Sequence, residues 1–476
     1  MTRINTNVES LIARRALDIN NASLNRALER LSSGLRINSG KDDPAGLIAS
    51  ETLRSGLRAI NQAIDNANRA DTIVSVAEGG LDEVSSLLLD LEALIDQTAN
   101  EAGMTDEEIA ANQSQIDSIL ASINRLAEAT AFGEKKLLNG NLAFTTSSIT
   151  TSELSQVQIN GAKIPAGATR EVVVNVITPS EVALISAVGA GAGGALGAAT
   201  TLQVRGNLGS DLLSFASGTS ADDMASSVNS SKDLTGVSAT VSNGALYFQS
   251  TSFGAANFVT VSVLENASTV FNSLADETTD NGVDGTVTVN GSNAIVKGLN
   301  ASVRSGSLSL DLTFDSAFGS VAGGSSSFHI TGGGAKFSIS PQVGLSGLEA
   351  LGISEVSTAK LGTADIGTLA TLGSGLANDL ASKNFATAQR VVRAAINQVA
   401  SLRGRLGAFQ KDTLQSTISS LQITAENVTA AESAIRDADF AVETSSLTRA
   451  QILVASSAQV LQLANATPQN VLALLG

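Results

Sequence analysis

The chain of 476 residues contains no cysteine and no tryptophan, and it has one histidine and one tyrosine. Without cysteine there can be no disulfide, no thiolate nucleophile and no cysteine-ligated metal. A single histidine also excludes a His-Glu-x-x-His zinc-protease helix. That histidine, His329, lies between Phe328 and Ile330 in an apolar run, where a structural role is the common one. We therefore expect no metal, no cofactor and no enzymatic activity.

Positive charge is also in short supply, since the formal net charge is -16 and the sequence pI is about 4.6. An acidic chain repels nucleic acid and anionic membranes, so neither is an expected partner. No apolar run is long enough to span a bilayer, and the first residues lack the basic and apolar regions of a conventional signal peptide. If the protein is exported, we expect another route.

Three local patterns that could suggest ligand chemistry have simpler explanations. The glycine runs at 189–194 and 332–334 are not followed by Lys-Ser/Thr, so they are not expected to be phosphate loops. The acidic pair at 42–43 is expected to form a solvated hinge. The second pair, Asp437 and Asp439, lies beside Arg436, and this group is expected to form an interface charge set with intermolecular ion pairs.

The two ends of the chain carry apolar residues at helical spacing. Near the start, leucines follow one another at intervals of seven, four, three and four residues, which is a heptad seam: Leu17, Leu24, Leu28, Leu31 and Leu35. Near the end the apolar positions are Ile452, Leu453, Val460, Leu463, Val471, Leu472, Leu474 and Leu475. No globular segment flanks either arm. We expect the arms to pack against each other and against other copies of the chain.

Long helices are expected inside these arms. Apolar spacing predicts one rod over 45–99, roughly 80 Å long at 1.5 Å per residue, with the pair at 79–80 as a weak point. Thr105 is expected to begin a second helix, with Glu108 completing a capping box. Asn139-Gly140 predicts a hairpin. Helical periodicity returns at about 373 and continues through Ala395, Val399, Leu402, Leu406, Phe409, Leu414, Ile418 and Leu421.

The middle of the chain has a different character from about 152. Alternating β-branched runs separated by Gly, Ser and Asn predict an all-β region, with a small helix at 220–229 and a loop at 189–197. The fold class is therefore α+β and multidomain. The two helical flanks pair into a coiled-coil or helical-bundle rod, and the β-rich region is inserted between them. The expected segments are an arm (1–43), a rod part with a hairpin (44–152), the β insertion (153–345), a second rod part (346–437) and an arm (438–476).

Both ends resemble one family. Residues 28–50, LERLSSGLRINSGKDDPAGLIAS, and residues 4–7, INTN, resemble the N-terminal signature of bacterial flagellins. Residues 427–441, NVTAAESAIRDADFA, and residues 468–475, PQNVLALL, resemble the C-terminal signature. Residues 202–263 are similar to a repeat found in the variable domains of some flagellins and hook-associated proteins. The resemblance covers roughly 1–150 and 370–476.

The resemblance implies a self-assembling filament subunit. The arms would form an inner coiled-coil tube, the 44–150 and 370–437 helices an outer tube, and the insertion would project outward. It also implies secretion through the channel by the flagellar type III export gate, with an export chaperone on the C-terminal arm. Hook-associated and cap proteins are further implied partners.

Two alternatives remain. A hook-associated junction protein shares the terminal pattern, although the 427–441 signature and the Leu-Leu terminus favour the filament protein. An adhesin or glycan-binding module would rest on the insertion alone. Tyr247 and Phe248 are isolated there, so no aromatic platform supports that reading.

One departure from the family concerns innate recognition. In flagellins sensed by the animal Toll-like receptor for flagellin, the segment that matches 78–100 carries an arginine where this chain has Asp90. Leu94 matches the family, and a glutamate on the next helix is replaced by Gln115. Reversing a charge at a recognition contact leaves a repulsive or unpaired group. The resemblance therefore implies weak receptor recognition.

Overall fold

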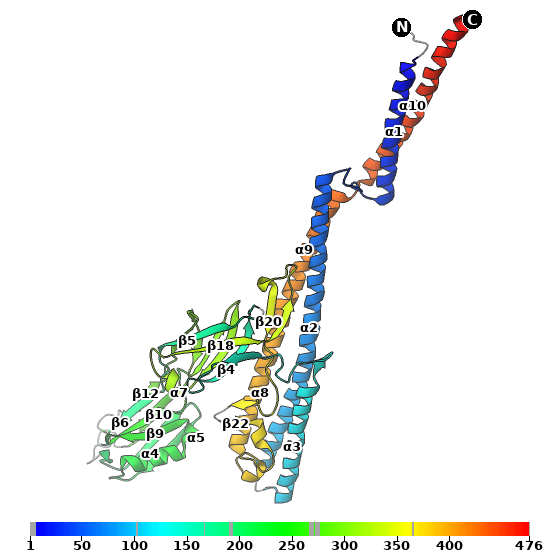
Figure 1. Ribbon diagram of the computed structural model, residues 1–476. Helices are drawn as coiled ribbons and strands as arrows, with labels where there is room; N and C mark the ends of the chain where they lie inside the picture. The colour runs from blue at the N-terminus through cyan, green and yellow to red at the C-terminus, as the bar shows by residue number, and fades with distance from the viewer. Residues whose placement is uncertain are drawn as a thin grey trace. The chain divides into compact units, whose positions relative to one another are not determined.

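The computed structural model describes residues 6–475 except 101–102, 166, 190–193, 266–270, 272–276 and 364–365, with side chains up to residue 466 (Figure 1). The chain forms two compact units. The first unit comprises residues 1–70, 338–343 and 411–476, and the second comprises 71–337 and 344–410. The sequence pattern over 45–99 predicts the long helix α2 (Pro44–Thr98). This helix contributes to both units.

The first unit is built from helices. It contains α1 (Val8–Ser33), the first part of α2, α9 (Ser416–Arg436) and α10 (Phe440–Leu475). The Asn7 side chain caps α1 by accepting a hydrogen bond from the Ser10 N–H at 3.0 Å. Gly34 ends α1 in the left-handed region with φ 73°, so Leu35 lies beyond the helix. The prediction that Leu35 continues the helical seam is therefore wrong.

The second unit contains a bundle of α2, α3 (Asp106–Ala129) and α8 (Phe385–Ala408). The seam predicted for this part of α2 is confirmed. Every member of it is at most 1% exposed: Val74, Ala77, Leu81, Val84, Leu88, Leu91 and Ile95. The positions predicted on α8 at 395, 399, 402 and 406 join the same core, while Phe409 is half-buried.

The capping box of α3 is also confirmed: the Thr105 N–H donates to the Glu108 carboxylate at 2.7 Å, and the Glu108 N–H donates to the Thr105 hydroxyl at 3.3 Å.

Two helix and turn predictions are wrong. The hairpin is formed by β1 (Ala131–Phe132) and β2 (Lys135–Lys136), not at Asn139-Gly140. The reason is that Leu137 and Leu138 are buried in the helical core, so the chain after β2 follows the bundle. Helix α8 begins at Phe385 rather than near 373. Before it, two short 3₁₀ turns (Leu369–Leu372 and Leu380–Ser382) bond to Gln113 of α3, whose amide donates to Leu372 O and accepts from Leu380 N.

The predicted heptad through 409–421 is interrupted. Residues 409–415 form a π-helical turn (Phe409–Gln415) between α8 and α9. The Gln410 amide reaches α2 and donates to the Asp71 carboxylate at 3.2 Å and to the Ser75 hydroxyl at 2.8 Å. A π turn shifts the helical phase, which is why one continuous heptad does not describe this stretch.

The β insertion has two cores, both in the second unit. In the first, a five-stranded sheet (order β14-β13-β5-β18-β3) faces a four-stranded sheet (order β15-β16-β17-β4), with all pairings antiparallel. In the second core, the sheets β6-β10-β9 and β12-β11-β7-β8 pack with one face of the helix α4 (Ala221–Ser230). The predicted small helix is thereby confirmed. Of the predicted 189–197 loop, residues 190–193 lie outside the described residues.

Strands such as β7 and β17 alternate more and less buried residues, as half-buried strands do. Their bounds are β3 (Phe144–Ser147), β4 (Leu154–Ala162), β5 (Arg170–Thr178), β6 (Leu184–Ala187), β7 (Thr200–Gly206), β8 (Ser210–Phe215), β9 (Val237–Ser242), β10 (Ala245–Ser250), β11 (Phe258–Val263), β12 (Glu277–Asn281), β13 (Thr286–Val289), β14 (Ser292–Asn293), β15 (Ile295–Lys297), β16 (Asn300–Arg304), β17 (Leu308–Phe314), β18 (Ser325–Gly333), β19 (Ala335–Ser338), β20 (Leu348–Leu351), β21 (Gly362–Thr363) and β22 (Gly367–Thr368). Short helices α5 (Lys232–Thr235) and α7 (Ser316–Gly319) connect them.

Within the described part of the chain, no helix combines the length and apolar character needed to cross a membrane.

The adjacent glycines of α2 differ in their surroundings and give a matched test of the bundle. A Cβ on Gly80 would lie 2.6 Å from the Thr130 hydroxyl oxygen and 3.0 Å from a Leu138 methyl, whereas a Cβ on Gly79 would meet nothing within 4 Å. Gly79→Ala should raise the free energy of unfolding by about 0.5–1 kcal/mol through helix propensity. Gly80→Ala should lower it by about 1–3 kcal/mol through overpacking. Denaturant unfolding followed by circular dichroism measures both, and equal shifts of one sign would contradict the packing.

Candidate functional site on the paired terminal helices

Helices α1 and α10 lie side by side and antiparallel in the first unit (Figure 1). The covered positions on each helix follow alternating intervals of four and three residues. On α1 they are Ala13, Leu17, Asn20, Leu24, Ala27 and Leu31, and on α10 they are Glu443, Leu447, Ala450, Val454, Ser457, Leu461 and Ala464. This is a heptad seam in which many positions are small or polar.

Side-chain bonds fix the register of the two helices. The contacts are Asn7 Nδ2 to Ala464 O at 2.7 Å, Ser10 Oγ to Asn465 Oδ1 at 2.7 Å, Asn20 Nδ2 to Ser457 Oγ at 2.6 Å and to Leu453 O at 3.4 Å, and Arg30 Nη1 to Glu443 Oε1 at 3.8 Å. Asn20 and Ser457 sit in the middle of the seam. A polar pair at such a position specifies register at the expense of stability.

The sequence identifies one of the two repeating positions of this seam. Leu17, Leu24 and Leu31, spaced by seven, are on the covered face. The second position was predicted at Leu28, but Leu28 is 46% exposed and its neighbour Ala27 is 4% exposed. The prediction favoured the larger apolar residue. At this position the face of α1 that α10 covers holds the smaller residue, Ala27.

Many large apolar residues of the arms point away from the seam. Among the described side chains, those that are at least 45% exposed are Val8, Leu11, Ile12, Ile19 and Leu28 on α1, and Phe440, Val442, Ile452, Leu453, Val460 and Leu463 on α10. Val460 is thus on the outer surface of the pair rather than in its seam. The side chains of Leu472 and Leu475 lie outside the described residues. Exposed apolar surface of this extent is typical of a protein-protein contact.

A main-chain clasp joins the two arms at their inner ends. Ala438 N donates to Gly34 O at 2.9 Å, and Arg36 N donates to Arg436 O at 2.7 Å. Between these bonds Leu35 and Asp437 form an antiparallel bridge. Ile37, directly after the clasp, is fully buried. The clasp therefore fixes where α1 ends and α10 begins.

The charged residues near the clasp pair within the chain. Arg436 Nη1 lies 2.9 Å from Glu51 Oε1, and its hydrogen bond holds the pKa of Glu51 below the usual value, with Arg54 as a lesser cause. Within the chain, Glu51 is thus a partner of Arg436, and the intermolecular ion pairs expected for this group stay a prediction. Asp439 caps α10 by accepting from Ala441 N at 2.9 Å, and Asp437 accepts from the Ser433 hydroxyl. These two aspartates thus have local roles.

The acidic pair at 42–43 is likewise structural. Asp42 accepts from the Ser39 hydroxyl at 2.9 Å and from the Ser39 N–H at 3.0 Å, and these bonds lower the pKa of Asp42. Asp43 caps α2 by accepting from Gly46 N at 2.9 Å. The expected solvated hinge is therefore a turn followed by a helix cap.

The receptor-like residues lie in the second unit. Asp90 and Gln115 are exposed, on α2 and α3 respectively. Leu94 is one turn after Asp90 and is partly buried against the bundle core. Near them, Asn112 of α3 donates to the Thr98 hydroxyl of α2 at 3.0 Å. That bond holds the two helices together at this end.

Comparison with known families separates the ends of the chain from its middle. The family model of the bacterial flagellin N-terminal helical region matches residues 4–143, and that of the C-terminal helical region matches residues 390–475. The flagellin hook IN motif matches residues 201–252, and together the three matches span more than half of the chain. The chain belongs to the bacterial flagellin family.

Some flagellins match this chain over part of its length, and others match it over nearly all of its length. Flagellin E of Vibrio cholerae is 40% identical over 157 residues, which are 33% of this chain and 41% of that protein. The chain therefore matches about two fifths of the length of that relative. The B-type flagellin of Pseudomonas aeruginosa is 28% identical over 529 aligned positions that cover 99% of both chains. Flagellins are structural proteins, not enzymes.

Solved flagellar proteins superpose only in part. The junction protein FlgL from Legionella pneumophila gives a TM-score of 0.29 at 11% identity, over 82% of this chain and 99% of that one. FliC from Burkholderia pseudomallei gives 0.25 at 15% identity, over 73% and 99%. At these TM-scores neither superposition separates a filament protein from a junction protein.

The Glu51 ion pair yields a pH prediction. A carboxyl with a lowered pKa stabilises the fold above its unfolded pKa, and that stabilisation is lost as the pH falls through the folded pKa. Arg436→Met should raise the pKa of Glu51 toward its ordinary value. Arg54→Met should raise it less, because Arg54 is the lesser cause. Carboxyl chemical shifts followed by NMR during an acid titration measure both, and a larger effect of Arg54→Met would contradict the assignment.

Proposed function

We propose that this flagellin is the structural subunit of the extracellular flagellar filament, and that copies assemble through their terminal arms. The observation that carries the proposal is the arrangement of the arm side chains. The seam between α1 and α10 mixes leucine and valine with small and polar residues, and eleven further large apolar residues of the two arms are at least 45% exposed. The pair therefore leaves much of its apolar surface uncovered. Under the proposal, neighbouring subunits bury that surface.

The proposal assigns a place to each segment. The arms at 1–43 and 438–476 form the inner tube, and Leu472 and Leu475 belong to it with the outward residues of α10. The helical segments at 44–152 and 346–437 form the outer tube. The insertion at 153–345 projects outward. Leu17, Leu24 and Leu31 hold the arms together, and Arg436, Asp437 and Asp439 keep the clasp at their base in shape.

Export of the chain and its assembly outside the cell both require partner proteins. The chain is exported unfolded through the type III export gate, with a chaperone covering the C-terminal arm until then. A chain without cysteine cannot be trapped by a disulfide on that route. In the assembled flagellum it contacts cap and hook-associated proteins. A junction role is the second candidate, and the assembly test distinguishes it.

Removal of residues 1–40 should abolish polymerisation and leave a folded monomer. The second unit has its own fully buried core, so it does not need the arm. Electron microscopy of the full chain with short filament seeds should show long tubes with a central channel, and the truncated chain should show none. Tubes from the truncated chain would refute the proposal. Caps bound only at filament ends by the full chain would indicate the junction role.

A point-variant pair tests the surface more finely. Leu463→Ser removes an arm residue that is 69% exposed, and Leu208→Ser removes a residue of the insertion that is 64% exposed. Leu463→Ser should raise the critical concentration for polymerisation by about tenfold, since burying a leucine contributes about 1.5–3 kcal/mol. Leu208→Ser should leave it unchanged. Sedimentation of polymer at a series of concentrations measures both variants, and equal effects would exclude a specific arm contact.

We further propose that weak recognition by the Toll-like receptor for flagellin is caused by the charge of Asp90 and the neutrality of Gln115. Asp90→Arg should increase the response of receptor-reporter cells over a dose series. Glu83→Arg, a change of the same charge at another exposed position of α2, should not. A wild-type response equal to that of a strong agonist flagellin would contradict the proposal.

A further inference from the structure

Five asparagines of the chain are each followed by glycine, a pair that is chemically reactive in water. They are Asn139, Asn160, Asn243, Asn281 and Asn290. The main-chain nitrogen of the glycine can attack the side-chain amide carbon of the asparagine, because glycine has no side chain to shield that nitrogen. The reaction needs a free amide, a free N–H on the glycine and room for the main chain to rotate. The structure decides which pair meets these conditions.

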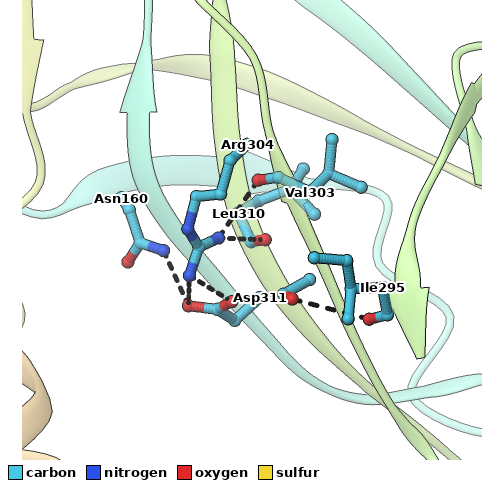
Figure 2. A network of polar contacts seen from close by, with 7 residues as sticks. Asn160, Ile295, Val303, Arg304, Leu310 and Asp311 are labelled. Carbon is cyan, nitrogen blue, oxygen red and sulfur yellow. Dashed lines mark hydrogen bonds and ion pairs between the residues drawn. The ribbon is translucent and has the colours of Figure 1, made fainter. Parts of the chain in front are cut away.

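Two of the five pairs are held by hydrogen bonds inside the insertion. Asn160 is buried in β4, and its amide donates to Asp311 Oδ2 of β17 at 2.7 Å (Figure 2). Asn281 ends β12, and the nitrogen that would attack its amide is occupied, since the Gly282 N–H donates to Asn257 O at 2.9 Å. Neither pair can react without breaking these bonds first.

A third pair is restrained at the edge of the helical core. Asn139 is half-buried, and its Oδ1 accepts from the Asn141 N–H at 3.3 Å. The residue before it, Leu138, is fully buried in the core of the second unit. The main chain at this pair is therefore anchored on one side and its amide is engaged on the other.

The remaining two pairs form hairpin turns of the same kind. Asn243 and Gly244 connect β9 to β10, with φ of 52° and 77°, and Asn290 and Gly291 connect β13 to β14, with φ of 47° and 78°. Positive φ at both central positions is the type I′ pattern, for which Asn-Gly is the preferred sequence. In either turn the asparagine main chain must rotate out of this conformation before the ring can close. The turns themselves thus impose the same requirement on both pairs.

The two turns differ in what holds the asparagine side chain. Asn290 Oδ1 accepts from the Val173 N–H of β5 at 2.8 Å, and its Nδ2 donates to Glu171 O at 3.3 Å. Its main-chain N–H also donates to Val173 O at 2.8 Å. Asn243 is exposed, and among the described residues its side chain has no hydrogen-bond partner. One asparagine is therefore fastened to a neighbouring strand, and the other is free.

We propose that Asn243 is a site of spontaneous deamidation, with water as the co-reactant. A base in the solvent takes the Gly244 N–H proton as that nitrogen bonds to Asn243 Cγ. The Cγ–Nδ2 bond breaks, and the amide nitrogen leaves as ammonia after taking up a proton. Water then opens the cyclic imide at one of its two carbonyls and leaves aspartate or isoaspartate at position 243. No group is oxidised or reduced.

The products change the turn in two ways. Each adds one negative charge to a chain that already carries -16. Isoaspartate also lengthens the main chain of the two-residue turn by one methylene. The turn has little room for this, because a Cβ on Gly194 would lie 2.0 Å from Gly244 O. The end of the β9–β10 hairpin must therefore rearrange when isoaspartate forms.

The test compares the two turns within one molecule. The monomeric full chain is kept in mildly alkaline buffer, and peptide mapping by mass spectrometry follows aspartate and isoaspartate at each position over time. Product should form at Asn243 about tenfold faster than at Asn290, because two side-chain hydrogen bonds of Asn290 must break first. In denaturant, where neither side chain is held, the two rates should be similar. A rate ratio no larger in the folded chain than in the unfolded one would overturn the proposal.

A pair of variants gives an independent readout. Asn243→Gly and Asn290→Gly each remove the reactive amide, and glycine accepts the positive φ of the turn. An enzymatic assay of total isoaspartate should show the early product lost in Asn243→Gly and unchanged in Asn290→Gly. Equal loss in both variants, or the absence of product at position 243 of the folded wild type, would contradict the assignment. Because the readout is on the monomer, failure of filament assembly does not affect it.

Discussion

Close approach of the two terminal helices is the constraint on which the first unit depends. Small residues, Ala450, Ser457 and Ala464, occupy part of the face of α10 that α1 covers. Asn20 with Ser457 and Asn7 with the Ala464 carbonyl set the register of the two helices. Leucines of both helices share the seam with these small residues, and the remaining large apolar residues of the arms point away from it. Their outward position is thus a direct result of how the two helices meet.

The same chain contains a second kind of heptad seam. In the second unit, Leu81, Leu88 and Leu91 are completely buried, and strands and turns cover the rest of the bundle. A seam of large residues buries enough apolar area to fold within one chain. The seam of the arms mixes leucines with Ala, Asn and Ser, and it leaves many large apolar residues of the arms exposed. Under the proposed function, other copies of the chain cover those residues.

How far the sequence predicts the structure depends on what each pattern reports. Periodicity located α2, α8, the α3 capping box and most of the buried strands, because burial imposes those spacings on a single element. Periodicity was wrong where a contact with another element decides which residue is buried. Ala27 rather than Leu28 lies on the face of α1 that α10 covers. The helix expected near 373 is replaced by turns that bond to Gln113. Asn139-Gly140 carries a hairpin signal, but the burial of Leu137 and Leu138 decides the path. The contact of Asn160 with Asp311 could not be found from spacing, since β4 is far from β17 in the chain.

The clasp at the base of the arms has a mechanical consequence. Its two bonds are between main-chain atoms, from Ala438 to Gly34 and from Arg36 to Arg436, so they do not depend on which side chains are present. They lie on either side of the bridge between Leu35 and Asp437, where the segment after α1 meets the segment before α10. A pull on either terminus along the arms is carried at this point by main-chain bonds. The arms can therefore transmit tension to the base of the first unit without relying on the side chains of the clasp itself.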